Sequence, residues 1–150
     1  MNKLFLTLFY SGLSPKAPGT VGSFVALILG LVLLNYLSMT TFFLLTLLIS
    51  VIAVKQINIY EKEIGTHDSK EIVIDELSGM WITLSIAAVE PNNYLLALIA
   101  FIFFRIFDIW KPSIIGKIDE KVKGGWGVMG DDMVAGFFAG LCTALVSTYI

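Results

Sequence analysis

Cysteine and histidine are almost absent from this sequence, which holds one of each, Cys142 and His67, among 150 residues. A single cysteine excludes an intrachain disulfide and a cysteine-based metal cluster. Cys142 lies in an apolar run, which is typical of a small side chain packed in a helix. Long polar linkers are absent too, so we expect one compact unit over residues 1–150.

Charge is also scarce and nearly balanced. Ten basic and twelve acidic residues give a net charge of -2, which offers no electrostatic reason to expect nucleic acid as a partner. Apolar residues replace the missing charge. The hydrophobic share is 57% and the mean hydropathy is +0.85, above the roughly 45–50% that is usual for soluble domains. The composition therefore predicts an all-α integral membrane protein.

The apolar runs predict about five transmembrane or re-entrant helices. Residues 22–54 are apolar except for a polar dent at 35–40, which indicates two helices of about 16 residues, or roughly 24 Å each. This is short for a hydrocarbon core of about 30 Å, so a deep re-entrant hairpin remains open there. Further spans are predicted at 72–89, 93–107 and 133–150. The run after Lys3 is too short for a signal peptide and predicts a short interfacial helix.

Basic residues alternate between the predicted connections, which indicates an orientation. All ten lie in three segments, 1–21, 55–71 and 105–132, and the turns near 35–40 and 90–93 hold none. Because cytoplasmic loops carry the excess of Lys and Arg, we expect these three segments in the cytoplasm. Among the twelve acids, only Glu90 falls on the outer side.

Five acids stand where predicted helices start or end on the cytoplasmic side: Asp75, Glu76, Asp108, Asp131 and Asp132. Three of them have a structural explanation when taken alone, since Asp131 suits a helix N-cap and Asp75 and Glu76 suit a helix start. Asp108 instead ends its helix, where the dipole disfavours an anion, and Arg105 three residues earlier partly neutralises it. Gathered together, these carboxylates would repel one another unless a cation joined them. Their hard oxygen ligands predict Mg²⁺, or manganese in its place.

Three stretches of small residues lie on the same side, at 17–23, 77–81 and 123–130. Backbone N–H groups leading into a helix bind anions, so these stretches are candidates for a phosphate cradle. Thr20 and Ser23 belong to the first of them. Arg105, Lys111 and Lys123 add positive charge, and Pro112 disfavours helical geometry at Lys111. Together with the metal, they predict hydrolysis of a phosphomonoester on a lipid headgroup by metal-activated water, with a spare carboxylate as base.

Three long segments carry a family resemblance: SGLSPKAPGTVGS at 11–23, HDSKEIVIDELSGMWITL at 67–84 and FRIFDIWKPSIIGKIDEKVKGGWGVMGDDMVAG at 104–136. On these segments the chain resembles the phosphatidylglycerophosphatase A family. The resemblance implies a magnesium-dependent enzyme of the bacterial inner membrane. Its substrate would be phosphatidylglycerol phosphate, dephosphorylated to phosphatidylglycerol at the cytoplasmic face.

The resemblance also implies site residues. Asp75 and Glu76 match the family's Asp-Glu pair, Asp108 and Lys111 its Phe-Asp-x-x-Lys-Pro segment, and Asp131 and Asp132 its Asp-Asp-x-x-Ala-Gly. Asp68 matches as a further candidate metal ligand. The chain departs from the family at Ile74, where a Trp is frequent, and this departure concerns packing more than chemistry.

Three other functions fit the sequence less well. An ion-coupled carrier would distribute its acids through the membrane and on both sides, whereas here they lie on one side. A lipid-alcohol transferase would have a D-x2-D-G-x2-A-R-x8-G-x3-D-x3-D pattern, and that spacing does not occur. A structural membrane subunit would leave the five gathered carboxylates unexplained.

Overall fold

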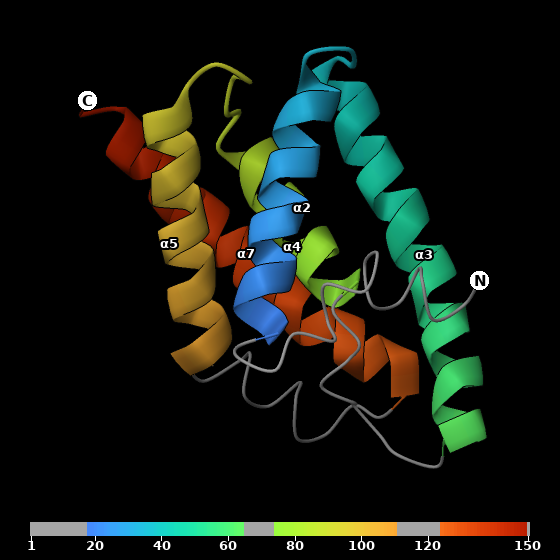
Figure 1. Cartoon of the computed structure of the whole chain (residues 1–150). Coiled ribbons are helices and arrows are strands. Elements are labelled where there is room, and N and C mark those ends of the chain that lie inside the picture. Colours follow the sequence, from blue (N-terminus) through green and yellow to red (C-terminus); the bar gives the residue numbers. More distant parts are fainter. Residues whose placement is uncertain (1–17, 65–73, 111–123, 150) are drawn as a thin grey trace.

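The computed structural model describes residues 18–64, 74–110 and 124–149. Over these residues the protein is all-helical, and the chain passes through five helices. They are α2 (Pro18–Leu34), α3 (Met39–Ile64), α4 (Ile74–Ile86), α5 (Tyr94–Trp110) and α7 (Gly124–Ser147). Each of the five apolar runs predicted as a span contributes one helix (Figure 1). The predicted interfacial helix near the N-terminus falls outside the described residues.

Local signals explain where several helices begin. Pro18 opens α2, in keeping with the fixed backbone angle that proline brings to a first helical position. Ser38 precedes α3, and its Oγ accepts a hydrogen bond from the backbone N–H of Thr41 at 3.2 Å, as an N-cap does. Asn93 precedes α5 and caps it in the same way, accepting from the N–H of Leu96 at 3.2 Å.

The short helix α4 is the centre of the bundle. It contacts α2, α3, α5 and α7, and every residue from Ile74 to Leu84 is buried. Trp81 ties α4 to α2, because its ring N–H donates to the carbonyl oxygen of Ala26 at 2.8 Å. Phe42 of α3 packs on the same ring, with 4.9 Å between the ring centroids. The polar side chains of α4, Asp75 and Glu76 among them, are therefore buried as well.

Two of the stretches predicted to bind anions, at 77–81 and 123–130, contribute their glycines to helices. Residues 77–81 lie inside α4, and residues 124–130 form the first turns of α7, so neither is a loop. The expected cradle at 77–81 is wrong, since backbone N–H groups within a helix are already bonded. The predicted start of the fifth helix at 133 is also wrong, because α7 begins at Gly124 and buries Met129 completely. Tertiary packing outweighs the cost of about 1 kcal/mol per helical glycine.

Helix lengths limit how far the membrane prediction is supported. By length and composition, one helix within the described ranges is suited to crossing a membrane, Met39–Tyr60 in α3. Two shorter apolar stretches are Thr20–Leu34 and Asp132–Ser147. The 13 residues of α4 extend only about 20 Å.

The two ends of the bundle differ in chemistry. The turn between α2 and α3 and the loop between α4 and α5 lie at the upper end in Figure 1. The starts of α2, α4 and α7 and the ends of α3 and α5 lie at the lower end. Asp75, Glu76, Asp108 and Asp132 therefore share one end, and Glu90 lies at the other.

Candidate active site

Three acidic side chains meet where α4 and α7 pack together. Asp75 and Glu76 come from the first turn of α4, and Asp132 comes from α7. One carboxylate oxygen of each residue lies within 4.8 Å of the other two. The residues are 8%, 7% and 2% exposed, so the cluster is largely shielded from solvent. We refer to Asp75, Glu76 and Asp132 as the carboxylate cluster.

Two glycines allow α4 and α7 to approach closely enough to form this cluster. A Cβ atom added to Gly79 would lie 2.6 Å from the carbonyl oxygen of Asp132, and one added to Gly136 would overlap the carbonyl group of Gly79. Thr83 of α4 spans the same contact, since its Oγ1 lies 2.9 Å from the carbonyl oxygen of Gly136. Small residues at a helix crossing let the two backbones come together. Gly79 and Gly136 thus place Asp132 next to the acids of α4.

Arg105 of α5 is the cation beside the cluster. Its Nη1 lies 2.6 Å from Asp108 Oδ2 and 3.1 Å from Glu76 Oε2. The predicted pairing of Arg105 with Asp108, three residues apart on one helix, is confirmed. Ser23 of α2 completes the group, because its hydroxyl donates to Glu76 Oε2 at 3.0 Å and accepts from Arg105 Nη1 at 3.2 Å. Side chains from α2 and α5 therefore fix the carboxylate of Glu76, which comes from α4.

Charge in this part of the protein is unbalanced. Within the described ranges, the guanidinium of Arg105 is the one cation beside four carboxyl groups, which are the three of the carboxylate cluster and Asp108. Oδ2 of Asp132 is buried and has no hydrogen-bond partner among the described residues, and neither has Nε of Arg105. A buried polar atom without a partner is costly and calls for an explanation. A cation held by the carboxylate cluster would supply one for Asp132.

The donor set of the cluster fits one kind of metal. Its candidate ligands are all carboxylate oxygens, which are hard donors that suit Mg²⁺ or Mn²⁺ better than the nitrogen and sulfur ligands typical of zinc. Magnesium sites commonly use one or two carboxylates and complete their octahedron with water and phosphate oxygens. The residues present therefore fit a magnesium ion.

The structure brings together most of the predicted site residues that it describes. The contacts above place six of these residues next to one another: Asp75, Glu76, Asp108, Asp132, Arg105 and Ser23. Thr20 is half-buried and lies in α2, three residues before Ser23. The backbone of Asp131 lies inside α7, so the interpretation of Asp131 as an N-cap is wrong because the helix begins earlier. Lys111, Lys123, His67 and Asp68 lie outside the described residues.

Sequence reasoning missed the structural role of two glycines. Gly79 and Gly136 decide how closely α4 and α7 approach. A signal for one of them was present, because Gly136 ends the Asp-Asp-x-x-Ala-Gly segment that carries Asp132. The spacing of four between Asp132 and Gly136 puts both on one face of the helix. That face is the one that packs on α4.

Comparison with known proteins identifies the family. The family model for phosphatidylglycerophosphatase A matches residues 4–147. The phosphatidylglycerophosphatase A of Escherichia coli K12 is 42% identical over 128 residues, which cover 85% of this chain and 73% of that protein. The Haemophilus influenzae protein of the same name is 40% identical over 131 residues, covering 87% of this chain and 79% of the relative.

A third relative carries a different name. A Bacteroides thetaiotaomicron protein, provisionally named a phosphatidylinositol-3-phosphatase, is 38% identical over 143 residues, which cover 93% of this chain and 89% of that protein. No solved structure matches this chain. The names of all three relatives denote phosphatases. By its match to the family model and by its identity to two of these relatives over most of their length, the chain belongs to the phosphatidylglycerophosphatase A family and is a phosphatase.

Proposed function

We propose that this protein hydrolyses the terminal phosphate of phosphatidylglycerol phosphate and releases phosphatidylglycerol and inorganic phosphate. The observation that carries the proposal is the carboxylate cluster, three buried acids from two helices whose oxygens lie within 4.8 Å of one another. Membership of the phosphatidylglycerophosphatase A family supports the choice of substrate. Water supplies the oxygen that ends on phosphate, and the bond between phosphorus and the lipid oxygen breaks.

We further propose that the protein lies in the bacterial inner membrane with several helices embedded and the carboxylate cluster facing the cytoplasm. Large apolar side chains on the outer faces of the helices support an apolar surrounding, among them Phe24, Leu48 and Leu98, each about half-exposed. Soluble monomers rarely expose large contiguous apolar patches, so this number of exposed apolar side chains favours a lipid surrounding. The basic residues, all within the segments 1–21, 55–71 and 105–132, support a cytoplasmic position for the end that carries the cluster.

Magnesium is the cofactor that fits the proposal. Asp75, Glu76 and Asp132 would hold the ion, and Asp108, Asp131 and Asp68 remain predicted ligands. Bound magnesium neutralises charge on a phosphoryl group and lowers the pKa of a coordinated water molecule. A carboxylate of the site accepts the proton that the nucleophilic water loses. Lys111 and Lys123 remain predicted contacts of the substrate phosphate.

Arg105 has a positioning role in addition to the substrate contact that the sequence predicts. Its Nη1 bonds to Asp108, Glu76 and Ser23. Its Nε has no hydrogen-bond partner among the described residues, so a phosphate contact through the rest of the guanidinium stays a prediction. We propose that Arg105 positions Glu76 and Asp108 and offsets part of their charge. Because a charged hydrogen bond of 2.6 Å is short and strong, Asp108 should keep its orientation during turnover.

The test compares lipid phosphates as substrates for detergent-purified protein. Phosphatidylglycerol phosphate should release phosphate faster than phosphatidic acid, and the Glu76→Gln variant should release little. Glu90→Gln, an exposed acid at the opposite end of the bundle, is the matched control and should behave as the unaltered protein. Full activity of Glu76→Gln would show that the reaction does not require the carboxylate of Glu76.

A second substrate has one observation in its favour. The Bacteroides thetaiotaomicron relative is named for phosphatidylinositol 3-phosphate, which is also a phosphomonoester on a lipid headgroup. The two lipids differ in the headgroup that carries the phosphate, and the three acids of the carboxylate cluster do not favour one headgroup over the other. Including this lipid in the substrate comparison decides between them by the ratio of the two kcat/KM values.

A further inference from the structure

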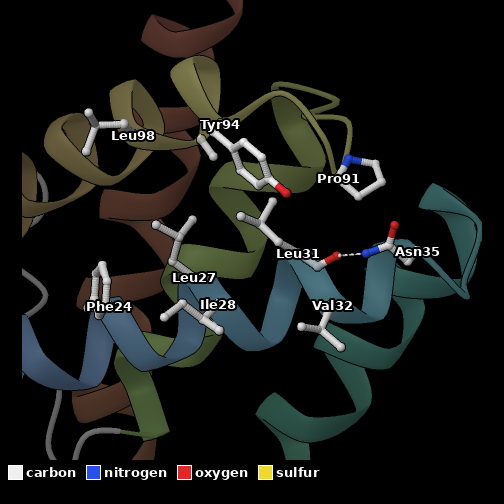
Figure 2. A pocket seen from close by; sticks show the side chains of 10 residues that line it. Phe24, Leu27, Ile28, Leu31, Val32, Asn35, Pro91, Tyr94 and Leu98 are labelled. Carbon is white, nitrogen blue, oxygen red and sulfur yellow. Dashed lines mark hydrogen bonds between the residues drawn. The ribbon is translucent and has the colours of Figure 1, made fainter.

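A long apolar groove runs along the outside of the bundle between α2 and α5 (Figure 2). Its volume is about 360 Å³. Phe24 lies at one end of its α2 wall and Asn35 at the other, with Ile28 and Val32 between them, and Leu98 belongs to the α5 wall. None of the residues that line it carries a charge, so its occupant should be apolar.

The groove starts next to the candidate active site. Phe24, at the end of its wall, directly follows Ser23, which bonds to Glu76. The other wall, α5, carries Arg105 and Asp108 about two to three turns beyond Leu98. Phe24 also meets Phe101 of α5 edge to face, with 6.1 Å between the ring centroids. The same two helices thus form the groove and hold the polar groups around Glu76.

The length and polarity of the groove indicate what would lie in it. From Phe24 to Asn35 the wall extends roughly 16 Å at a rise of 1.5 Å per residue, close to one leaflet, or half of a hydrocarbon core about 30 Å thick. Asn35 is the polar side chain at the far end, and its Nδ2 already donates to the carbonyl oxygen of Leu31 at 3.1 Å. The hydroxyl of Tyr94 is a second polar group of the lining. From Phe24 to Val32 the α2 wall offers apolar side chains alone.

We propose that this groove binds an acyl chain of the phospholipid whose phosphate lies at the carboxylate cluster. The inference rests on the proposed function and adds a binding site for the lipid tail. One end of such a lipid is anionic and suits a cation held by the acids, and the other end is apolar and suits the groove. A polar site that continues into an apolar groove matches the polar headgroup and apolar tail of a phospholipid.

A second groove of about 330 Å³ between α3, α4 and α7 provides a comparison. Its wall on α7 extends only from Met133 to Phe138, roughly 8 Å. It crosses three helices instead of following one, so an extended chain would fit only a short part of it. We therefore assign the tail to the groove along α2.

Filling each groove with a tryptophan tests the assignment. Ile28→Trp narrows the long groove, and Leu47→Trp is the matched control in the short one. Both side chains are partly exposed, at 47% and 38%, so both variants should fold. The readout is the KM of phosphatidylglycerol phosphate with long acyl chains divided by the KM of the same lipid with short chains.

We expect Ile28→Trp to raise this KM ratio by about threefold to tenfold. The effect is this modest because the micelle is as apolar as the groove, so the tail gains only van der Waals contacts when it enters the groove. Leu47→Trp should leave the ratio unchanged. An unchanged ratio for Ile28→Trp, whether both KM values stay the same or both rise by the same factor, would overturn the proposal. If the unaltered protein hydrolyses neither lipid, it is the proposed function that fails.

A binding measurement decides on the groove without turnover. A phosphatidylglycerol phosphate analogue with a photoreactive diazirine in its acyl chain is cross-linked to the full-length protein, and the labelled residues are mapped by mass spectrometry. We expect labels on Ile28, Val32 and Leu98 that excess unlabelled lipid removes. Labels spread equally over exposed residues of α3 such as Leu48, with no effect of competitor, would contradict the assignment.

Discussion

Replacing Asp132 by asparagine should make the protein more stable without metal and less able to bind it. The substitution keeps the shape of the side chain and removes one negative charge from the carboxylate cluster. Asp132 is 2% exposed, and its Oδ2 has no hydrogen-bond partner in the described part of the chain. The ion pairs of Arg105 go to Glu76 and Asp108 instead. The charge of Asp132 is therefore the least compensated of the three.

The size of the effect follows from the distances. The facing oxygens of Asp132, Asp75 and Glu76 lie within 4.8 Å of one another. Two unit charges at this separation repel by about 3.5 kcal/mol at an effective dielectric constant of about 20. Asparagine also brings an amide that donates to a neighbouring carboxylate. Allowing for screening and rearrangement, we expect Asp132→Asn to raise the free energy of unfolding of the metal-free protein by about 1–3 kcal/mol.

The assay is unfolding in detergent, followed with EDTA and again with increasing magnesium. Magnesium at about a hundred times its dissociation constant should stabilise the unaltered protein by about 2.7 kcal/mol and should have little effect on Asp132→Asn. Phosphate release by the variant should fall at least about a hundredfold, since even outer-shell partners of a metal are worth about 10–100-fold. Glu90→Gln should match the unaltered protein throughout. A variant that is less stable in EDTA and still gains from magnesium would refute this reasoning.

Further predictions concern Arg105, Gly136 and Trp81. Arg105→Ala should lower kcat more than it raises the KM for lipid, because Arg105 orients Glu76; a rise in KM alone, measured by steady-state kinetics, would instead make it a phosphate contact. Gly136→Ala should destabilise the protein by about 1–3 kcal/mol, because its Cβ would overlap Gly79; an unchanged unfolding midpoint, with Leu141→Ala on the exposed side of α7 as control, would show that the helices separate freely. Trp81→Phe should cost about 0.5–1.5 kcal/mol by removing the hydrogen bond from the ring N–H to the carbonyl oxygen of Ala26, and wild-type unfolding would contradict a role for that bond.

The sequence was sufficient for the helices and for much of the site. Apolar runs separated by polar dents predicted all five described helices, because a chain segment surrounded by apolar groups must satisfy its backbone hydrogen bonds internally. The pairing of Arg105 with Asp108 followed from their spacing on one helix. Acids at several helix termini on one side were expected to meet, and Asp75, Glu76 and Asp132 do.

Contacts between distant segments could not be predicted in this way. Ser23 and Glu76 are 53 positions apart, and nothing in either segment specifies the hydrogen bond between them. The close approach of Gly79 and Gly136 likewise depends on how α4 and α7 cross. The stretches at 77–81 and 123–130 are predicted as anion cradles from their small residues alone, whereas residues 77–81 and 124–130 belong to helices that other helices cover.

The most direct test of the account is phosphate release from phosphatidylglycerol phosphate by the detergent-purified protein, with magnesium and then with excess EDTA. We expect release with magnesium, none with EDTA, and recovery when magnesium is restored. Release that continues undiminished in EDTA would contradict the carboxylate cluster as a metal site. Absence of release under all conditions, from protein shown to be folded, would contradict the proposed reaction itself.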